Sequence, residues 1–173
     1  MSRVTGASAA RLALLPIAAF LLSACGLQEG LAQRSESAAT PAQAPAISGV
    51  TLAGRPLSWS SVHGHAVVLD FWASWCGPCR AEQADLNRLF REYGGRGVVF
   101  LGIDLRDDNA SALSYTRDLS VAYASIADSA EQISAAYDVS APPTIVVVDQ
   151  HGAIASRFLG TVVGVSDALN RVL

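Results

Sequence analysis

Trp75-Cys76-Gly77-Pro78-Cys79 is the stretch that decides the fold. The apolar run Ala66–Trp72 before it predicts a buried strand, and residues 80–90 after it have the composition and spacing of a helix. Cys76 therefore lies near a helix N-terminus, where free N–H groups and the helix dipole favour a thiolate. Two cysteines at this spacing can close a disulfide and exchange it with another protein through a mixed disulfide.

Two other uses of the cysteine pair are open at this stage. Structural zinc takes four ligands, but the only further cysteine is Cys25, and His63, His65 and His151 show no ligand spacing. An inert structural disulfide needs neither Gly-Pro between the cysteines nor a helix start behind them. We therefore predict a redox pair that uses no metal and no cofactor.

The first 24 residues have the features of a bacterial export signal. Two arginines give a positive start, and the apolar run 12–22 is too short to span a bilayer as a mature helix. Leu22-Ser23-Ala24-Cys25 then resembles the lipobox of bacterial lipoproteins, in which Cys25 is lipidated and becomes the mature N-terminus. The alternative is an ordinary cleaved signal that leaves a spare thiol. The lipobox predicts a domain anchored to the cell membrane at its periplasmic or outer face, where disulfides persist.

Composition divides the rest of the chain into two parts. Residues 25–46 comprise the lipidated cysteine and a stretch rich in Ala, Gln, Ser, Gly and Pro, which predicts a flexible tether. Residues 47–173 have the length of one domain and can bury a core without disulfides. Loss of Arg3 and Arg11 with the signal changes the net charge from −3 to −5. An acidic domain argues against nucleic acid as a partner, and we expect a monomer.

Hydrophobic periodicity predicts an α/β domain with a mixed central sheet flanked by helices. The predicted strands are 47–52, 55–59, 66–72, 98–104, 144–149 and 154–160, the first two forming an N-terminal β-hairpin, and the predicted helices are 77–93, 109–118, 129–137 and 166–172. The first helix is expected to stop at Gly94-Gly95. Asn109 is the expected N-cap of the second helix, and Asp128 or Ser129 that of the third.

At this point the chain resembles the thioredoxin-fold proteins, and within them the TlpA/ResA-type lipoproteins, which are membrane-anchored thiol–disulfide oxidoreductases. The resemblance rests on residues 70–82 (DFWASWCGPCRAE) and on Ala141-Pro142-Pro143-Thr144. The N-terminal hairpin and the helix that follows the 98–104 strand suit the same branch. The resemblance implies that Cys76 is the exposed nucleophile and Cys79 the buried resolving cysteine of a redox disulfide.

The resemblance also implies where a substrate binds. Pro143 matches the cis-proline that faces the disulfide and leaves backbone groups free to pair with a client segment; a trans peptide that merely starts a strand is the alternative. The residues expected to contact the substrate are Trp75, Gly77, Pro78, Pro142 and Thr144. The tyrosines Tyr115, Tyr123 and Tyr137 are expected only to pack.

Two carboxylic acids flank the pair. Asp70 aligns with the buried carboxylate under the thioredoxin disulfide, where burial raises its pKa and lets it accept the Cys79 proton; the alternative is an aspartate at a strand end that faces solvent. Glu82 shares a helix face with Cys79 and aligns with a glutamate that influences the cysteines of TlpA/ResA proteins, or is an ordinary exposed residue. Ala84 replaces a helix-kinking proline of many relatives, and the chain has no lysine to accompany Asp70.

Together these features predict an exported, lipid-anchored thiol–disulfide oxidoreductase. The Gly-Pro dipeptide favours the reduction of disulfides in exported proteins, with a membrane thiol donor restoring the pair. The resemblance suggests apocytochrome c as one client, because its haem-binding thiols must be reduced. An oxidase of the same fold that introduces disulfides, and a metallochaperone that holds Cu(I) through the two thiolates, are the alternatives.

Overall fold

The computed structural model describes residues 42–173. The predicted signal (1–24), Cys25 and most of the predicted tether lie outside the described residues. No helix within 42–173 is both long and apolar enough to cross a membrane.

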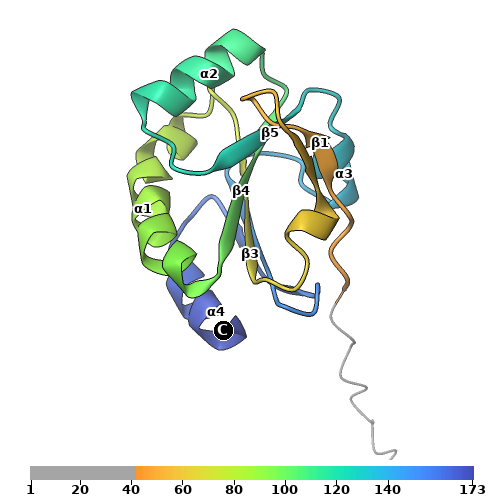
Figure 1. The fold of residues 1–173 in the computed structure, drawn as a ribbon. Helices are drawn as coiled ribbons and strands as arrows, with labels where there is room; N and C mark the ends of the chain where they lie inside the picture. The colour runs from red at the N-terminus through yellow and green to blue at the C-terminus, as the bar shows by residue number, and fades with distance from the viewer. Residues whose placement is uncertain (1–41) are drawn as a thin grey trace, which may run out of the picture. The chain divides into compact units, whose positions relative to one another are not determined.

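A five-stranded mixed sheet lies at the centre of the domain (Figure 1). Its strands, in spatial order, are β5 (Ala124–Asp128), β4 (Val99–Leu105), β3 (Val67–Trp72), β6 (Thr144–Val148) and β7 (Ile154–Leu159). β3 pairs in parallel with β4 and antiparallel with β6; β4 pairs in parallel with β5, and β6 antiparallel with β7. Because β3 lies between two neighbours and under helices, all six of its residues are buried.

Helices cover both faces of this sheet, as the sequence predicted. The helices are α1 (Gly77–Tyr93), α2 (Asn109–Asp118), α3 (Gln132–Ala136) and α4 (Val165–Val172). In Figure 1, α1, α2 and α4 lie on one side of the sheet, and α3 lies on the other with the small antiparallel hairpin of β1 (Ser48–Val50) and β2 (Pro56–Ser58). The predicted hairpin is confirmed, although its strands are shorter than expected.

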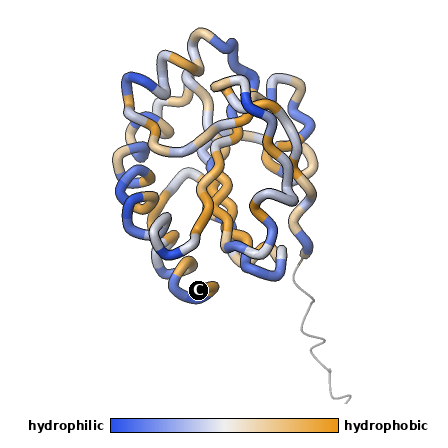
Figure 2. Tube along the Cα trace, in the orientation of Figure 1, coloured by the Kyte–Doolittle hydropathy of each residue, from blue (hydrophilic) through white to orange (hydrophobic). Residues whose placement is uncertain are grey.

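Alternation along the strands gives the two faces different side chains. Val67, Leu69 and Phe71 belong to the apolar layer that packs with Tyr137 beside α3. Val68 points to the opposite layer, which contains the inner sides of α1 and α4. Figure 2 shows the strands as the most continuously hydrophobic part of the domain, with hydrophilic stretches along the outer sides of the helices.

Three predictions about the extent of the elements need correction. β5 was not predicted, because its sequence, ASIAD, contains one large apolar residue. α1 does end at Tyr93, but Gly94 and Gly95 continue into a 3₁₀ turn that Gly97 ends with a positive φ of 87°. The third helix starts later than expected, at Gln132. Glycine and other small residues fit several kinds of secondary structure, so their pattern in the sequence does not locate such boundaries.

The helix caps differ from those predicted. Asp108, not Asn109, caps α2, because its carboxylate accepts hydrogen bonds from the N–H groups of Ala110 and Ser111. Glu131, not Asp128 or Ser129, is the N-cap residue of α3, although the Asp128 carboxylate accepts bonds from N–H groups at the start of this helix. In both loops an aspartate supplies the acceptor that helix N-termini require.

The last residues of the predicted tether are bonded to the domain. Gln43 forms a β-bridge with Ala153, and the Ala44 N–H donates to the carbonyl oxygen of Gly152 at 2.8 Å. Pro45 accepts a hydrogen bond from the Tyr137 hydroxyl at 2.7 Å. The domain therefore includes residues from at least 42, because this segment extends the β6–β7 hairpin, and the boundary placed after residue 46 is too late.

Candidate redox site

The two cysteines form a disulfide where β3 passes into α1. Their Cα atoms are 5.3 Å apart. Cys76 is the N-cap of α1, and its sulfur accepts a hydrogen bond from the Cys79 N–H at 3.1 Å. A sulfur anion at this position would be stabilised by the same N–H group and by the helix dipole. The helix then runs through Ala84 to Tyr93 without a break, as expected from the missing proline.

The exposed position expected for Cys76 is not seen in the disulfide form. Cys76 is 4% exposed and Cys79 2%, and both belong to a buried cluster with Trp72 and Tyr115. In this state the Cys76 sulfur is bonded to that of Cys79. The neighbours Trp75, Gly77 and Pro78 are exposed, and contact between Gly77, Pro78 and a client stays a prediction.

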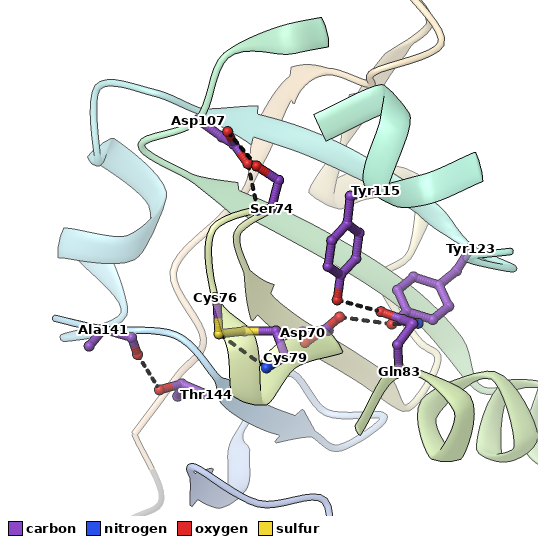
Figure 3. The surroundings of a disulfide bond; sticks show 10 residues. All are labelled: Asp70, Ser74, Cys76, Cys79, Gln83, Asp107, Tyr115, Tyr123, Ala141 and Thr144. Carbon is purple, nitrogen blue, oxygen red and sulfur yellow. Dashed lines mark hydrogen bonds between the residues drawn. A yellow bond between two sulfur atoms is a disulfide. The ribbon is translucent and has the colours of Figure 1, made fainter. Parts of the chain in front are cut away.

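The predicted cis-proline is confirmed, because the Pro142–Pro143 peptide is cis. The flanking residues Ala141 and Thr144 lie in the immediate surroundings of the disulfide (Figure 3), where the Thr144 hydroxyl donates to the Ala141 carbonyl at 2.9 Å. Pro142, Pro143 and Thr144 line a groove of about 360 Å³, together with Leu159 and other residues of this edge. Two of the residues expected to contact the substrate, Pro142 and Thr144, therefore line the same groove as the cis-proline.

Asp70 is buried next to the pair, which excludes the solvent-facing alternative. It is 1% exposed, and the Tyr123 hydroxyl donates to its Oδ2 at 2.7 Å. Burial raises the pKa of Asp70 to about 7, and the hydrogen bond from Tyr123 partly opposes this rise. A carboxyl that titrates near neutrality, in the surroundings of the disulfide (Figure 3), can accept and return a proton there.

Tyr123 belongs to a buried polar network that was not predicted from the sequence. Gln83 donates from Nε2 to the Tyr123 hydroxyl at 3.0 Å and to Asn87 Oδ1 at 3.2 Å. The Gln83 Oε1 accepts from the Tyr115 hydroxyl at 3.3 Å. Tyr115 and Tyr123 therefore do more than pack, since they connect α2 and the start of β5 to Asp70. Gln83 and Asn87 lie four residues apart on the helix face of Leu86, and this spacing was the available signal.

Glu82 is also buried, which excludes an ordinary exposed position. It is 9% exposed, and its Oε1 has no hydrogen-bond partner within the part of the chain that the structure describes. Burial raises the pKa of Glu82 to about 7, and the charges of Asp70 and Asp85 add to the rise. The carboxyl groups of Asp70 and Glu82 therefore influence each other, and a proton on one favours ionisation of the other.

Trp75 stands at the surface beside Cys76. Its side chain is held by a hydrogen bond from Nε1 to the carbonyl oxygen of Arg106 at 3.4 Å, and the Arg106 guanidinium lies 5.5 Å from the ring centroid. The residue is 55% exposed. Contact between this ring and a substrate stays a prediction.

The histidines lie apart from this site. His63, His65 and His151 are exposed, and within residues 42–173 no three His, Cys, Asp or Glu side chains are gathered as metal ligands.

Comparison with known proteins identifies the family. Residues 41–157, more than half of the chain, match the model of the AhpC/TSA family. The chain belongs to the AhpC/TSA family. Among relatives, the thioredoxin-like protein YneN of Bacillus subtilis is 33% identical over 123 residues, which cover 69% of this chain and 71% of YneN. The thiol–disulfide oxidoreductase ResA of Bacillus cereus is 25% identical over 145 residues, which cover 81% of this chain and 84% of ResA.

A solved structure agrees with this membership of the AhpC/TSA family. A secreted disulfide oxidoreductase of Mycobacterium tuberculosis superposes with a TM-score of 0.65 at 25% identity, covering 72% of this chain and 95% of the other. These similarities confirm the predicted thioredoxin-like fold. With the disulfide in place at the start of α1, they make this AhpC/TSA member a thiol–disulfide oxidoreductase.

Proposed function

We propose that the enzyme reduces disulfides in exported proteins. The observation that carries this proposal is the disulfide at the N-terminus of α1 with Asp70 buried beside it. The helix N-terminus supports the attacking thiolate, and the buried carboxyl supplies a proton acceptor. The Gly77-Pro78 dipeptide, which resembles that of reducing thioredoxins, favours this direction over the introduction of disulfides.

The reaction proceeds through two thiol–disulfide exchanges. The Cys76 thiolate attacks one sulfur of the client disulfide, so that a mixed disulfide forms and the first client thiolate leaves. Cys79 passes its proton to Asp70 and attacks the Cys76 sulfur, which releases the second client thiolate. The client gains two electrons and two protons, and the enzyme is left with the Cys76–Cys79 disulfide. A dithiol donor at the membrane returns two electrons and two protons.

Glu82 completes the proton transfer in this proposal. Its carboxyl and that of Asp70 influence each other behind the disulfide. When Asp70 takes the Cys79 proton, its negative charge disappears and Glu82 ionises more readily. Glu82 also lines a surface groove with Pro78 and Thr161, and this position gives the proton a route from the buried acid to solvent.

The cellular location belongs to the same proposal. The lipobox-like sequence at residues 22–25 supports export and lipidation of Cys25. The similar Mycobacterium tuberculosis enzyme is described as secreted. An enzyme anchored outside the cytoplasm would meet exported proteins with wrong disulfides, and apocytochrome c, whose thiols must be reduced before haem attachment, is one client of this kind.

Trapping tests the roles of the two cysteines. Cys79→Ser should accumulate mixed disulfides with clients in the native cell, because the resolving thiol is missing, and Cys76→Ser should accumulate none. Mass spectrometry of the trapped proteins identifies the clients. Equal trapping by both variants would contradict the assigned roles.

The direction of the reaction, reduction or formation of client disulfides, is tested with purified protein. The reduced enzyme should reduce insulin disulfides faster than the oxidised enzyme restores disulfides to a reduced, unfolded protein. The opposite order would support the oxidase, and stoichiometric copper without either activity would support the metallochaperone. Cys25→Ala should move the enzyme from the membrane fraction to the soluble fraction; retention on the membrane would overturn the lipid anchor.

A further inference from the structure

A third buried acid, Asp104, lies close to the redox site, and the mechanism above does not use it. Asp104 is near the end of β4 and is 1% exposed. Its Oδ1 has no hydrogen-bond partner among the described residues. Asp104 pairs with Trp72 across the sheet, just as Gly102 pairs with Asp70. Alternation therefore directs Asp104 to the same face of the sheet as Asp70 and Trp72.

The charged and titratable groups around Asp104 are mostly acidic. Asp107 and Asp108 follow Asp104 in the loop that leads to α2. On the neighbouring strand β3, Asp70 lies two residues before Trp72, the residue that pairs with Asp104. Tyr115 of α2 belongs to the same buried cluster as Trp72. The closest arginine in sequence, Arg106, forms an ion pair with Glu131 at 3.1 Å. Burial, the charges of Asp107 and Asp108, and a hydrogen bond with Asp107 raise the pKa of Asp104 to about 8. At neutral pH Asp104 therefore carries a proton.

Asp107 is the group whose hydrogen bond contributes to the raised pKa of Asp104, and it also holds the segment before Cys76. Its Oδ2 accepts from the Ser74 N–H at 2.6 Å, and its Oδ1 accepts from the Ser74 hydroxyl at 2.9 Å (Figure 3). The Asp108 N–H also donates to Oδ1 at 3.0 Å. Asp107 thus acts as an acceptor in every one of these bonds. Protonated Asp104 adds a further donor and removes what would otherwise be repulsion between neighbouring carboxylates.

Three hydrogen bonds join this loop to the residues just before the nucleophile. Two are the Ser74 bonds to Asp107, and the third joins Trp75 Nε1 to the Arg106 carbonyl. The Cys76 N–H in turn donates to the Ala73 carbonyl at 3.1 Å. The position of Cys76 therefore depends on the loop after β4 through a continuous set of bonds.

We propose that Asp104 and Asp107 form a hydrogen-bonded carboxyl pair that positions residues 73–75, and through them Cys76, for thiol–disulfide exchange. The inference rests on the redox role of Cys76, and Asp104 is a positioning residue because it acts through Asp107. When Asp104 loses its proton, the bond to Asp107 is lost and two adjacent carboxylates repel each other. The Ser74 contacts then weaken, and Cys76 is held less well above pH 8.

The test measures how fast reduced Cys76 reacts with a small aromatic disulfide between pH 6 and 10, with Asp104→Asn and Asp104→Ala as variants. Each rate is divided by the fraction of Cys76 thiolate, measured by its ultraviolet absorbance. For the native enzyme this corrected rate should fall about tenfold above pH 8, the size expected for one charge-assisted hydrogen bond. Asp104→Asn should abolish the fall, since its amide donates without titrating. Asp104→Ala should be about tenfold slower at pH 7.

Asp167→Asn is the matched control, because Asp167 is exposed on α4 and loses the same charge. It should keep the native profile. An alkaline fall that persists in Asp104→Asn, or a native rate in Asp104→Ala, would overturn the proposal.

A second measurement avoids dependence on variants that fail to fold. In the native oxidised enzyme, nuclear magnetic resonance should show the Asp104 carboxyl carbon and the Ser74 amide titrating together near pH 8. Separate titrations, or an Asp104 already ionised at pH 6, would refute the pair. Neither measurement uses a protein client, so failure to reduce exported proteins would refute the proposed function and leave this inference standing.

Discussion

The two faces of β3 and β4 are built from alternate residues of the same strands, yet they differ in kind. The face toward α3 receives Leu69, Phe71, Leu101 and Ile103, and is apolar. The face toward α1 and α2, which we call the redox face, receives the acids Asp70 and Asp104, with Glu82 added from α1. On this face burial raises the pKa of each acid to 7 or 8. The comparison teaches that the buried acids of β3 and β4 are confined to the layer that also contains the disulfide.

The largest effect is expected from placing an acid on the apolar face. Leu69→Asp should lower the free energy of unfolding by about 4 kcal/mol or more at pH 7, because it buries a carboxyl group among apolar side chains. Urea denaturation of the oxidised protein measures the change. Val163→Asp, at a position that is 78% exposed, is the control and should unfold like the native protein. Equal stability of the two variants would show that the faces do not differ.

The second effect is the pH dependence of stability caused by the redox face. Asp70 and Glu82 have a pKa of about 7 in the fold against 3.8 and 4.5 ordinarily, so the native state binds more protons than the unfolded chain between these values. The contribution of these two groups to the free energy of unfolding is therefore greatest below pH 4. It decreases as the pH rises to 7, by up to about 1.4 kcal/mol per pH unit for each group. Asp70→Asn should remove the contribution of Asp70 to this dependence of the unfolding free energy on pH. Unfolding free energies that are constant from pH 4 to 7 would contradict the raised pKa values.

The third prediction concerns space on the redox face. A Cβ on Gly102 would collide with Ser125 Oγ and lie 2.7 Å from Trp72 Nε1, two atoms that are hydrogen bonded at 3.2 Å. Gly102→Ala should therefore cost about 1–3 kcal/mol of stability, measured by thermal unfolding. Gly95→Ala, where an added Cβ meets nothing within 4 Å, is the control. A Gly102→Ala protein as stable as this control would show that the layer can expand.

The smallest effect is expected from removing one hydroxyl on each face. Tyr123→Phe removes the hydrogen bond that lowers the pKa of Asp70, so the pH profile for resolution of a mixed disulfide should move to higher pH, with a stability loss of about 1 kcal/mol. Tyr137→Phe, which removes a bond to Pro45 beside the apolar face, should leave the pH profile unchanged. The profile is measured by stopped-flow release of a thiol from the mixed disulfide. A shift of the same size in both variants would mean that Asp70 is not the group that titrates.

The motif and its flanks allowed the centre of the domain to be predicted from the sequence. β3 is a continuous apolar run that ends at the cysteines, and α1 has a strong amphipathic pattern. Both signals are local, which is why the strand, the helix and the disulfide position were predicted together. The cis-proline and Asp70 could be assigned only through family resemblance, since neither has a local signature.

The features that were missed depend on contacts between distant residues. Tyr123 reaches Asp70 across 53 positions in the sequence, and Ser74 reaches Asp107 across 33. β5 is a strand because β4 pairs with it, since its small residues have little strand preference of their own. The burial of Glu82 likewise depends on what α1 packs against, which helical spacing alone does not determine.

The bridge between Gln43 and Ala153 has a consequence for orientation. It lies at the β6–β7 turn, whereas Thr144, at the other end of β6, lies beside the disulfide. The chain thus enters the domain at one pole and the disulfide occupies the other, roughly 20 Å away by the length of a strand. A domain held from its N-terminal side presents the disulfide outward, toward proteins in the surrounding compartment. In the arrangement proposed above, with Cys25 anchored and the electron donor in the same membrane, the disulfide would face away from that donor, so re-reduction would require the domain to turn over.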